Sequence, residues 1–111
     1  MQVQVIQQKI YEIRGHKVML DFDLAKLYEV ETRILNQAVK RNLDIFPEDF
    51  MFQLNGKEWN TMSSQFVMTY PAKRPKTALP FAFTEHGVAM LANVLKSKKA
   101  RQISVSIIRA F

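Results

Sequence analysis

The spacing of apolar residues along the chain changes between helical and strand-like periods. Helical spacing of three and four covers the apolar positions within 24–28 and the segments 32–42, 57–66 and 85–95, and we expect a helix in each. Short β-prone runs occupy 3–6, 10–14, 17–20, 50–54 and 80–83. Residues 100–111 also carry a helical stripe, although 104–107 alone alternate as a strand would, and we expect a helix there.

Turn and capping residues separate these segments. Gly15 is the residue between 10–14 and 17–20 that is free to adopt a positive φ, so a hairpin is expected there. Asp21 or Asp23 can cap the first helix, and Thr32 can cap the second. Thr84 can cap the helix 85–95, in whose first turn Gly87 indicates a close approach of another backbone segment.

This order of elements predicts an α+β fold for one compact domain spanning 1–111. Its expected parts are a helix-turn-helix-like unit, short strands with a hairpin, and a C-terminal pair of helices. With 111 residues, 48% of them hydrophobic, the chain is long enough to bury a core without disulfides, and it contains no cysteine.

The helix expected at 32–42 carries one polar side. Its members are spaced by 3, 4, 7 and 8 residues, which gathers them on one face: Arg33, Asn36, Gln37, Lys40 and Arg41. These side chains suit base edges and phosphates in a major groove. An ordinary amphipathic surface helix would also be polar on one side. The absence of an acid from this face, and the short helix before it, favour DNA binding.

Individual roles follow from side-chain chemistry. Asn36 and Gln37 can pair with adenine edges, and Arg33 can reach a guanine near the start of the helix. Lys40 and Arg41 lie farther along and are expected at phosphates, which position a protein without specifying a sequence.

Positive charge is concentrated in the second half of the chain. Residues 1–60 hold eight Lys or Arg and nine Asp or Glu, whereas 61–111 hold eight Lys or Arg and one acid, Glu85. The formal net charge is +6, and so one-sided a distribution indicates an anionic partner, with double-stranded DNA the expected one. A solvated surface that aids solubility is the alternative.

Two basic clusters could add phosphate contacts. Lys73, Arg74 and Lys76 lie between two prolines and could form an arm that grips the backbone beside the helix. Lys98 and Lys99, with Lys96 and Arg101, form the second cluster.

Several other function classes find no support in the sequence. His16 and His86 are distant and lack carboxylates at ligand spacing, so neither a metal site nor a cofactor is expected. No nucleophile, P-loop or dinucleotide motif indicates an enzyme. The sequence has no run long enough to span a bilayer and no signal-peptide pattern, so a cytoplasmic protein is expected.

Three ordered blocks of the sequence resemble the N-terminal domain of phage antirepressor and KilA-N-type proteins, and more narrowly the open-reading-frame-six N-terminal domain. The blocks are 13–42, 46–54 and 79–95. The resemblance implies a DNA-binding domain of phage or prophage regulators, usually fused to a C-terminal domain that would be missing here. One departure is Glu29, which stands where helix-turn-helix turns often have glycine.

A second hypothesis is a protein-interaction module, binding a phage or host regulator or forming a homodimer. Its basis is the last segment, whose residues are more apolar than a short solvent-facing helix needs: Ile103, Ile107, Ile108 and Phe111.

Overall fold

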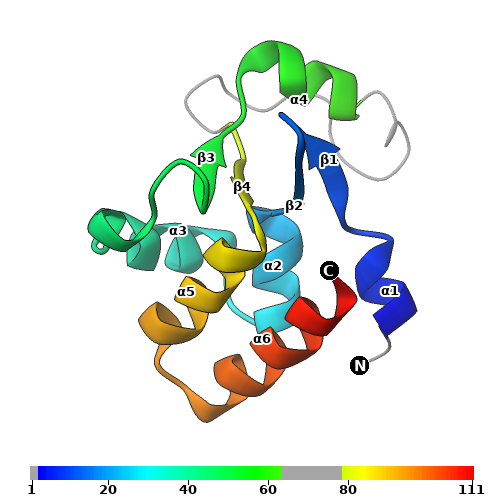
Figure 1. Ribbon diagram of the computed structural model, residues 1–111. Helices are drawn as coiled ribbons and strands as arrows, with labels where there is room; N and C mark the ends of the chain where they lie inside the picture. Colours follow the sequence, from blue (N-terminus) through cyan, green and yellow to red (C-terminus); the bar gives the residue numbers. More distant parts are fainter. Residues whose placement is uncertain (1–2, 64–78) are drawn as a thin grey trace.

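The computed structural model describes residues 3–63 and 79–111, which form three layers around a central sheet (Figure 1). The strands are β1 (Tyr11–Ile13), β2 (His16–Leu20), β3 (Met51–Gln53) and β4 (Phe81–Phe83), all antiparallel, in the order β1-β2-β4-β3. The helices are α1 (Val3–Gln7), α2 (Asp21–Tyr28), α3 (Thr32–Lys40), α4 (Gly56–Ser63), α5 (Glu85–Leu95) and α6 (Lys98–Ala110), with a 3-10 turn η1 (Leu43–Ile45). The expected α+β class is confirmed.

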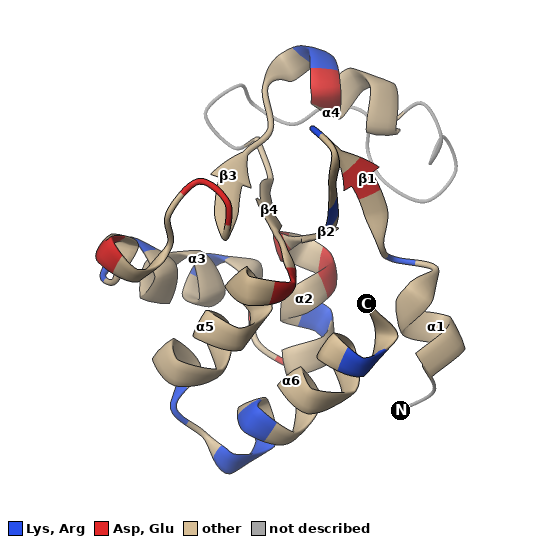
Figure 2. Cartoon of the chain, viewed as in Figure 1, with Lys and Arg blue, Asp and Glu red and all other residues tan. Residues whose placement is uncertain are grey.

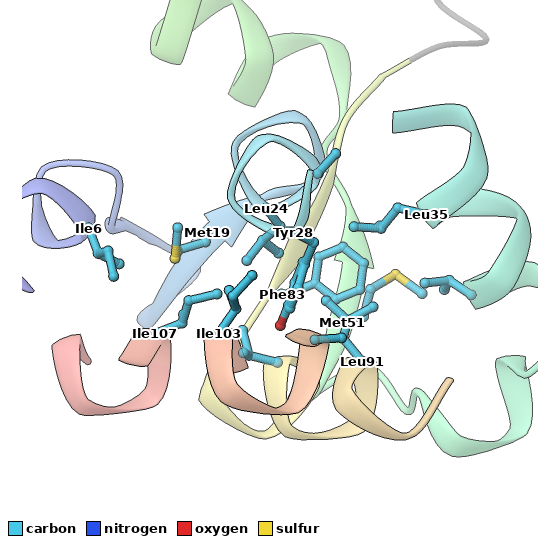
Figure 3. Close-up of a cluster of buried hydrophobic side chains, with 14 of the residues drawn as sticks. Ile6, Met19, Leu24, Tyr28, Leu35, Met51, Phe83, Leu91, Ile103 and Ile107 are labelled. Atoms are coloured by element: carbon cyan, nitrogen blue, oxygen red, sulfur yellow. The ribbon is translucent and has the colours of Figure 1, made fainter. Parts of the chain in front are cut away.

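Both faces of the sheet are buried, because alternate residues of each strand enter different cores. Val18, Phe52 and Ala82 pack with Trp59 and Met62 of α4. Their neighbours in the same strands point the other way, into the main core with the remaining helices: Met19, Met51 and Phe83 (Figure 3). The helix-turn-helix unit therefore lies against the larger core, on the side of the sheet opposite α4.

The expected hairpin is confirmed, but its turn differs in one respect. Ile13 pairs with His16, which leaves a two-residue turn in which both Arg14 (φ 54°) and Gly15 (φ 77°) are left-handed. Gly15 is thus not the single residue with positive φ. The conformation directs the Arg14 side chain over the Phe52 ring, 4.3 Å from its centroid.

Glu58 fastens the hairpin to α4. Its carboxylate accepts two hydrogen bonds from Arg14, at 2.8 and 2.9 Å, which lower the pKa of Glu58 below its usual value. Glu58 and Asn55 also exchange hydrogen bonds between side chain and backbone amide, at 2.8 and 2.9 Å. This is a capping box, and it explains why α4 starts at Gly56.

Several expected helix boundaries need correction. Helix α2 begins at Asp21 and α3 at Thr32, so Leu20 and Glu31 occupy the N-cap positions, and neither makes a side-chain cap hydrogen bond. Helix α3 ends at Lys40 rather than at 42, and the 3-10 turn η1 follows it from Leu43. Residues 3–6, expected to be β-prone, belong to α1, where Ile6 is buried in the main core. Here tertiary packing outweighs the strand preference of Val and Ile.

The two C-terminal helices form as expected. The Thr84 hydroxyl accepts a hydrogen bond from the Gly87 amide at the start of α5, and residues 98–110 are helical, so the strand alternative for 104–107 is wrong. Ile103 and Ile107 are buried in the protein's own core. Tyr28 hydrogen-bonds Ser104 at 2.6 Å, and burial raises the pKa of Tyr28 to about 12. The apolar character of α6 is therefore used within the molecule.

None of the helices in the described residues is long and apolar enough to cross a lipid bilayer.

Gly87 marks the close backbone approach that the sequence indicates. A Cβ atom at this position would lie 2.1 Å from the carbonyl oxygen of Phe50, which also accepts a hydrogen bond from the Thr84 amide. Nothing lies within 4 Å of a Cβ placed at Gly56, which occupies the first turn of α4.

We therefore expect Gly87→Ala to lower the free energy of unfolding by roughly 2–4 kcal/mol, because the clash is with backbone and cannot relax by rotation. The matched variant Gly56→Ala should leave stability unchanged or raise it by up to about 1 kcal/mol. Urea unfolding measures both. Equal effects of the two substitutions would contradict the contact.

Candidate nucleic-acid interface

Helices α2 and α3 form a compact helix-turn-helix unit. The turn is 29–31, and Glu29 adopts a left-handed conformation there (φ 60°, ψ 42°). The amides of Glu29 and Val30 close the end of α2 by donating to Lys26 O at 3.2 Å and Ala25 O at 3.0 Å. The tight turn thus forms without glycine, and the Glu29 carboxylate pairs with Lys99 of α6.

One side of α3 is anchored in the core. Leu35 and Val39 are buried, and α3 contacts both α2 and α5. Asn42 follows the helix and donates its side-chain amide to Ala38 O at 2.8 Å, which satisfies a carbonyl at the helix end. The orientation of α3 is therefore set by packing on one side and by hydrogen bonding at its C-terminal end.

The other side of α3 faces solvent. Four of the five residues expected at DNA are exposed there: Arg33, Gln37, Lys40 and Arg41. Arg33 lies 3.5 Å from Glu31, but both side chains remain largely exposed, at 64% and 73%. Solvent screens such a pair strongly, so Arg33 remains available for a stronger partner. Figure 2 marks the Lys and Arg positions along α3 in blue.

Asn36 does not join this exposed face, contrary to the expectation. It is half-buried, and its Nδ2 donates to Asp21 Oδ2 at 3.0 Å. The Asp21 carboxylate is fully buried and also accepts from the backbone amides of Phe22, at 2.7 Å, and Phe81, at 3.3 Å. A buried carboxylate requires donors, and Asn36 supplies one of them. Its role here is to fix α3 against α2 and β4.

The remaining predicted cations separate into two groups. Lys98 and Lys99 lie in the first turn of α6 and are exposed, and the pairing of Lys99 with Glu29 brings this turn beside the helix-turn-helix unit. Lys73, Arg74 and Lys76 lie outside the described residues.

The structure also exposes two residues of this unit that the sequence analysis missed. Ile34, 40% exposed, borders the polar face of α3, and Lys26 is exposed in the last turn of α2. Ile34 lies three residues before Gln37 and seven before Arg41, which places it on the rim of the same face, but an apolar side chain does not belong to the polar pattern that the sequence shows.

Among the described residues, no three His, Asp or Glu side chains converge as a metal site requires. His86 instead stacks on Phe50, with ring centroids 5.2 Å apart.

Comparison with known proteins adds one match. Residues 8–94 match the family model described as the ORF6N domain, which covers most of the chain, including β1, β2, α2, α3 and nearly all of α5. Neither the curated proteins nor the solved structures contain a match.

The left-handed conformation of Glu29 can be tested by substitution. Glu29→Gly and Glu29→Ala both remove the ion pair with Lys99, but only glycine takes this conformation without a Cβ penalty. The glycine variant should be more stable than the alanine variant by about 1 kcal/mol, measured by thermal or urea unfolding. A more stable alanine variant would mean that the turn is not left-handed.

Substitutions of the neighbours Asn36 and Gln37 should affect the stability of the protein differently. Asn36→Ala removes a donor from a buried carboxylate and should cost about 1–3 kcal/mol of unfolding free energy. Gln37→Ala, an exposed neighbour, should change it by less than about 0.5 kcal/mol. Chemical denaturation of the two variants in parallel checks this, and an unaffected Asn36→Ala would refute the bridging role.

Proposed function

The chain belongs to the ORF6N domain family, and from this premise we propose that it binds double-stranded DNA sequence-specifically as a regulatory domain of a phage or prophage. Helix α3 is the recognition helix and enters the major groove. In this proposal the domain carries out no reaction and acts where the DNA is, in the cytoplasm.

The observation that carries the proposal is the exposed, acid-free face of α3 held outward by its buried side. A helix with side chains is about 10–12 Å across, which a major groove about 12 Å wide admits. The nine residues of α3 rise about 13 Å, enough to follow roughly four base-pair steps. The anchoring by Asn36 and Asp21 limits the loss of entropy on binding, because the helix is already oriented.

Each exposed residue of α3 has a distinct task in this arrangement. Gln37 pairs with an adenine edge, Arg33 reaches a guanine, and Ile34 offers an apolar contact to a thymine methyl group. Lys40 and Arg41 contact phosphates beyond the bases.

Flanking contacts come from two places. Lys98 lies in the helical turn that the Lys99–Glu29 pair brings beside the recognition unit, so it can neutralise a neighbouring phosphate. Lys99 can do so only if its ammonium group leaves the Glu29 carboxylate and binds a phosphate instead. Lys73, Arg74 and Lys76 provide an additional backbone contact in this proposal, on the basis of their sequence alone.

The alternative of a protein-interaction module loses its original basis. Ile103 and Ile107, from which it was inferred, are buried in the protein's own core, and Ile108 and Phe111 are partly buried. DNA binding is therefore the function that the geometry supports better.

Selection of bound duplexes from a random pool should yield a preferred site, and two variants should then behave differently. Gln37→Ala should lose about 1–3 kcal/mol of binding free energy on that site and tolerate base changes at one position. Lys40→Ala should weaken binding to all duplexes alike and reduce the slope of log K against log salt by about one. Fluorescence anisotropy at several salt concentrations measures both effects.

Lys57→Ala is the matched control, because Lys57 is an exposed lysine on α4, across the sheet from α3. It removes the same charge and should leave the preferred-site affinity close to that of the unchanged protein. Failure to bind any duplex at low salt would refute the proposal. Equal losses of DNA affinity for Lys40→Ala and Lys57→Ala would mean that α3 does not contact the DNA.

A further inference from the structure

Large exposed hydrophobic side chains identify surfaces beyond the recognition helix. Five occur in the described residues: Val3 (38%), Val5 (50%), Ile34 (40%), Leu43 (55%) and Val105 (48%). Ile34 belongs to the face of α3 already described. The other four fall on two surfaces of opposite charge, which we define as the basic surface and the acidic surface.

The basic surface is the stripe of Arg101, Val105 and Arg109 on α6, and the neighbouring helix α1 carries the exposed Val3 and Val5. The three residues of α6 are spaced by four, which places them on one exposed stripe of the helix. Helix α1 packs beside α6, and Gln7 Nε2 donates to Ala110 O at 3.4 Å. Neither helix contains an acidic residue, and no ion pair engages Arg101 or Arg109 within the described part of the chain.

The acidic surface consists of Leu43, Asp44, Glu48 and Asp49, which follow α3. All four side chains are exposed. The chain contains no Lys or Arg from 42 to 56. Arg14 of the hairpin shares a surface pocket with Glu48 and Asp49, but its guanidinium is engaged by the Glu58 carboxylate at 2.8 and 2.9 Å. No ion pair engages its three carboxylates in the parts of the molecule that the structure describes.

The two surfaces lie on different sides of the molecule. In Figure 2 the segment after α3 projects on one side, whereas α1 and the C-terminal end of α6 lie on the other. Helices α2 and α5 stand between them, since α5 packs against both α3 and α6 and α2 does the same. Asp49 approaches the end of α6, since it lines one pocket with Phe111, but no ion pair joins the two surfaces within the described residues.

We propose that the basic surface of one copy docks on the acidic surface of a second copy, giving a head-to-tail association. The pairing matches Arg101 and Arg109 with Asp44 and Glu48, and it covers Val105 and Leu43. A second copy is the occupant because the chain carries both complementary halves. Such a contact is heterologous, so each added copy leaves one of each surface free.

The expected strength follows from the nature of the contact. Exposed ion pairs contribute little each and are screened by salt, and the apolar area is limited to a few side chains. Association should therefore be weak and should fall as salt is raised. The exposed face of α3 belongs to neither surface, although the acidic surface begins two residues after Arg41. The association itself does not depend on DNA binding.

Sedimentation equilibrium of the unmodified protein at low salt is the first test. The weight-average mass should rise steadily with concentration, without a plateau at the dimer, and should fall when salt is added. Arg109→Glu should weaken association at least tenfold, because like charges then face each other. Lys57→Glu makes the same charge change on α4 and should leave association nearly unaffected.

Mixing two blocked variants gives the decisive test. Arg101→Glu/Arg109→Glu reverses the basic surface, and Asp44→Lys/Glu48→Lys reverses the acidic surface. Each should be monomeric alone, provided that circular dichroism shows an unchanged melting profile. The first variant then carries two acidic surfaces and the second variant carries two basic surfaces, so copies of the same variant repel each other. When the two variants are mixed, acidic surfaces can again meet basic ones, and the mixture should associate.

Three outcomes would overturn the inference. The first is an unmodified protein that stays monomeric at its highest soluble concentration in low salt. The second is a plateau at the dimer, which indicates a symmetric contact, and the third is a mixture that remains monomeric. Binding of the unmodified protein to one short duplex, at a protein concentration where it is monomeric, tests DNA recognition separately, so a failure of one proposal is distinguishable from a failure of the other.

Discussion

The buried carboxylate of Asp21 is the constraint on which the arrangement of the recognition unit depends. It lies at the first residue of α2 and accepts hydrogen bonds from Phe22, from Asn36 of α3 and from the amide of Phe81 in β4. A charge this deep is tolerated only when donors surround it. Meeting that requirement brings two helices and the first residue of the inner strand β4 together, and so fixes the direction in which α3 presents its exposed side.

The rest of the fold packs around this meeting of α2, α3 and β4 from both sides of the sheet. Because successive side chains of each strand point to opposite faces of the sheet, α4 packs on one hydrophobic cluster, and α2 and α3 pack on the other. The missing Cβ of Gly87 lets α5 approach the carbonyl of Phe50, and α5 in turn packs against α3. On the far side of α2, Tyr28 joins α6 through Ser104. Helix α3 is thus held by a contiguous packed structure rather than by its own short length.

The candidate site was predictable where it depends on local spacing. The exposure of Arg33, Gln37, Lys40 and Arg41 follows from the helical period and from the apolar residues opposite. The inward turn of Asn36 did not follow, because its partner Asp21 is fifteen residues away and its burial depends on how two helices cross. The apolar residues of α6 were misjudged for a similar reason: their core partners are distant in the sequence.

The sequence by itself determined the class of the fold, the hairpin, the two C-terminal helices and the close approach at Gly87, since periodicity, capping residues and glycine act over a few neighbours. Only the tertiary structure decided which polar side chains bond to the protein and which face solvent. It also decided that α1 is helical and that opposite charges lie on separate sides. Those outcomes depend on contacts between distant segments, where burial and hydrogen bonding outweigh local preference.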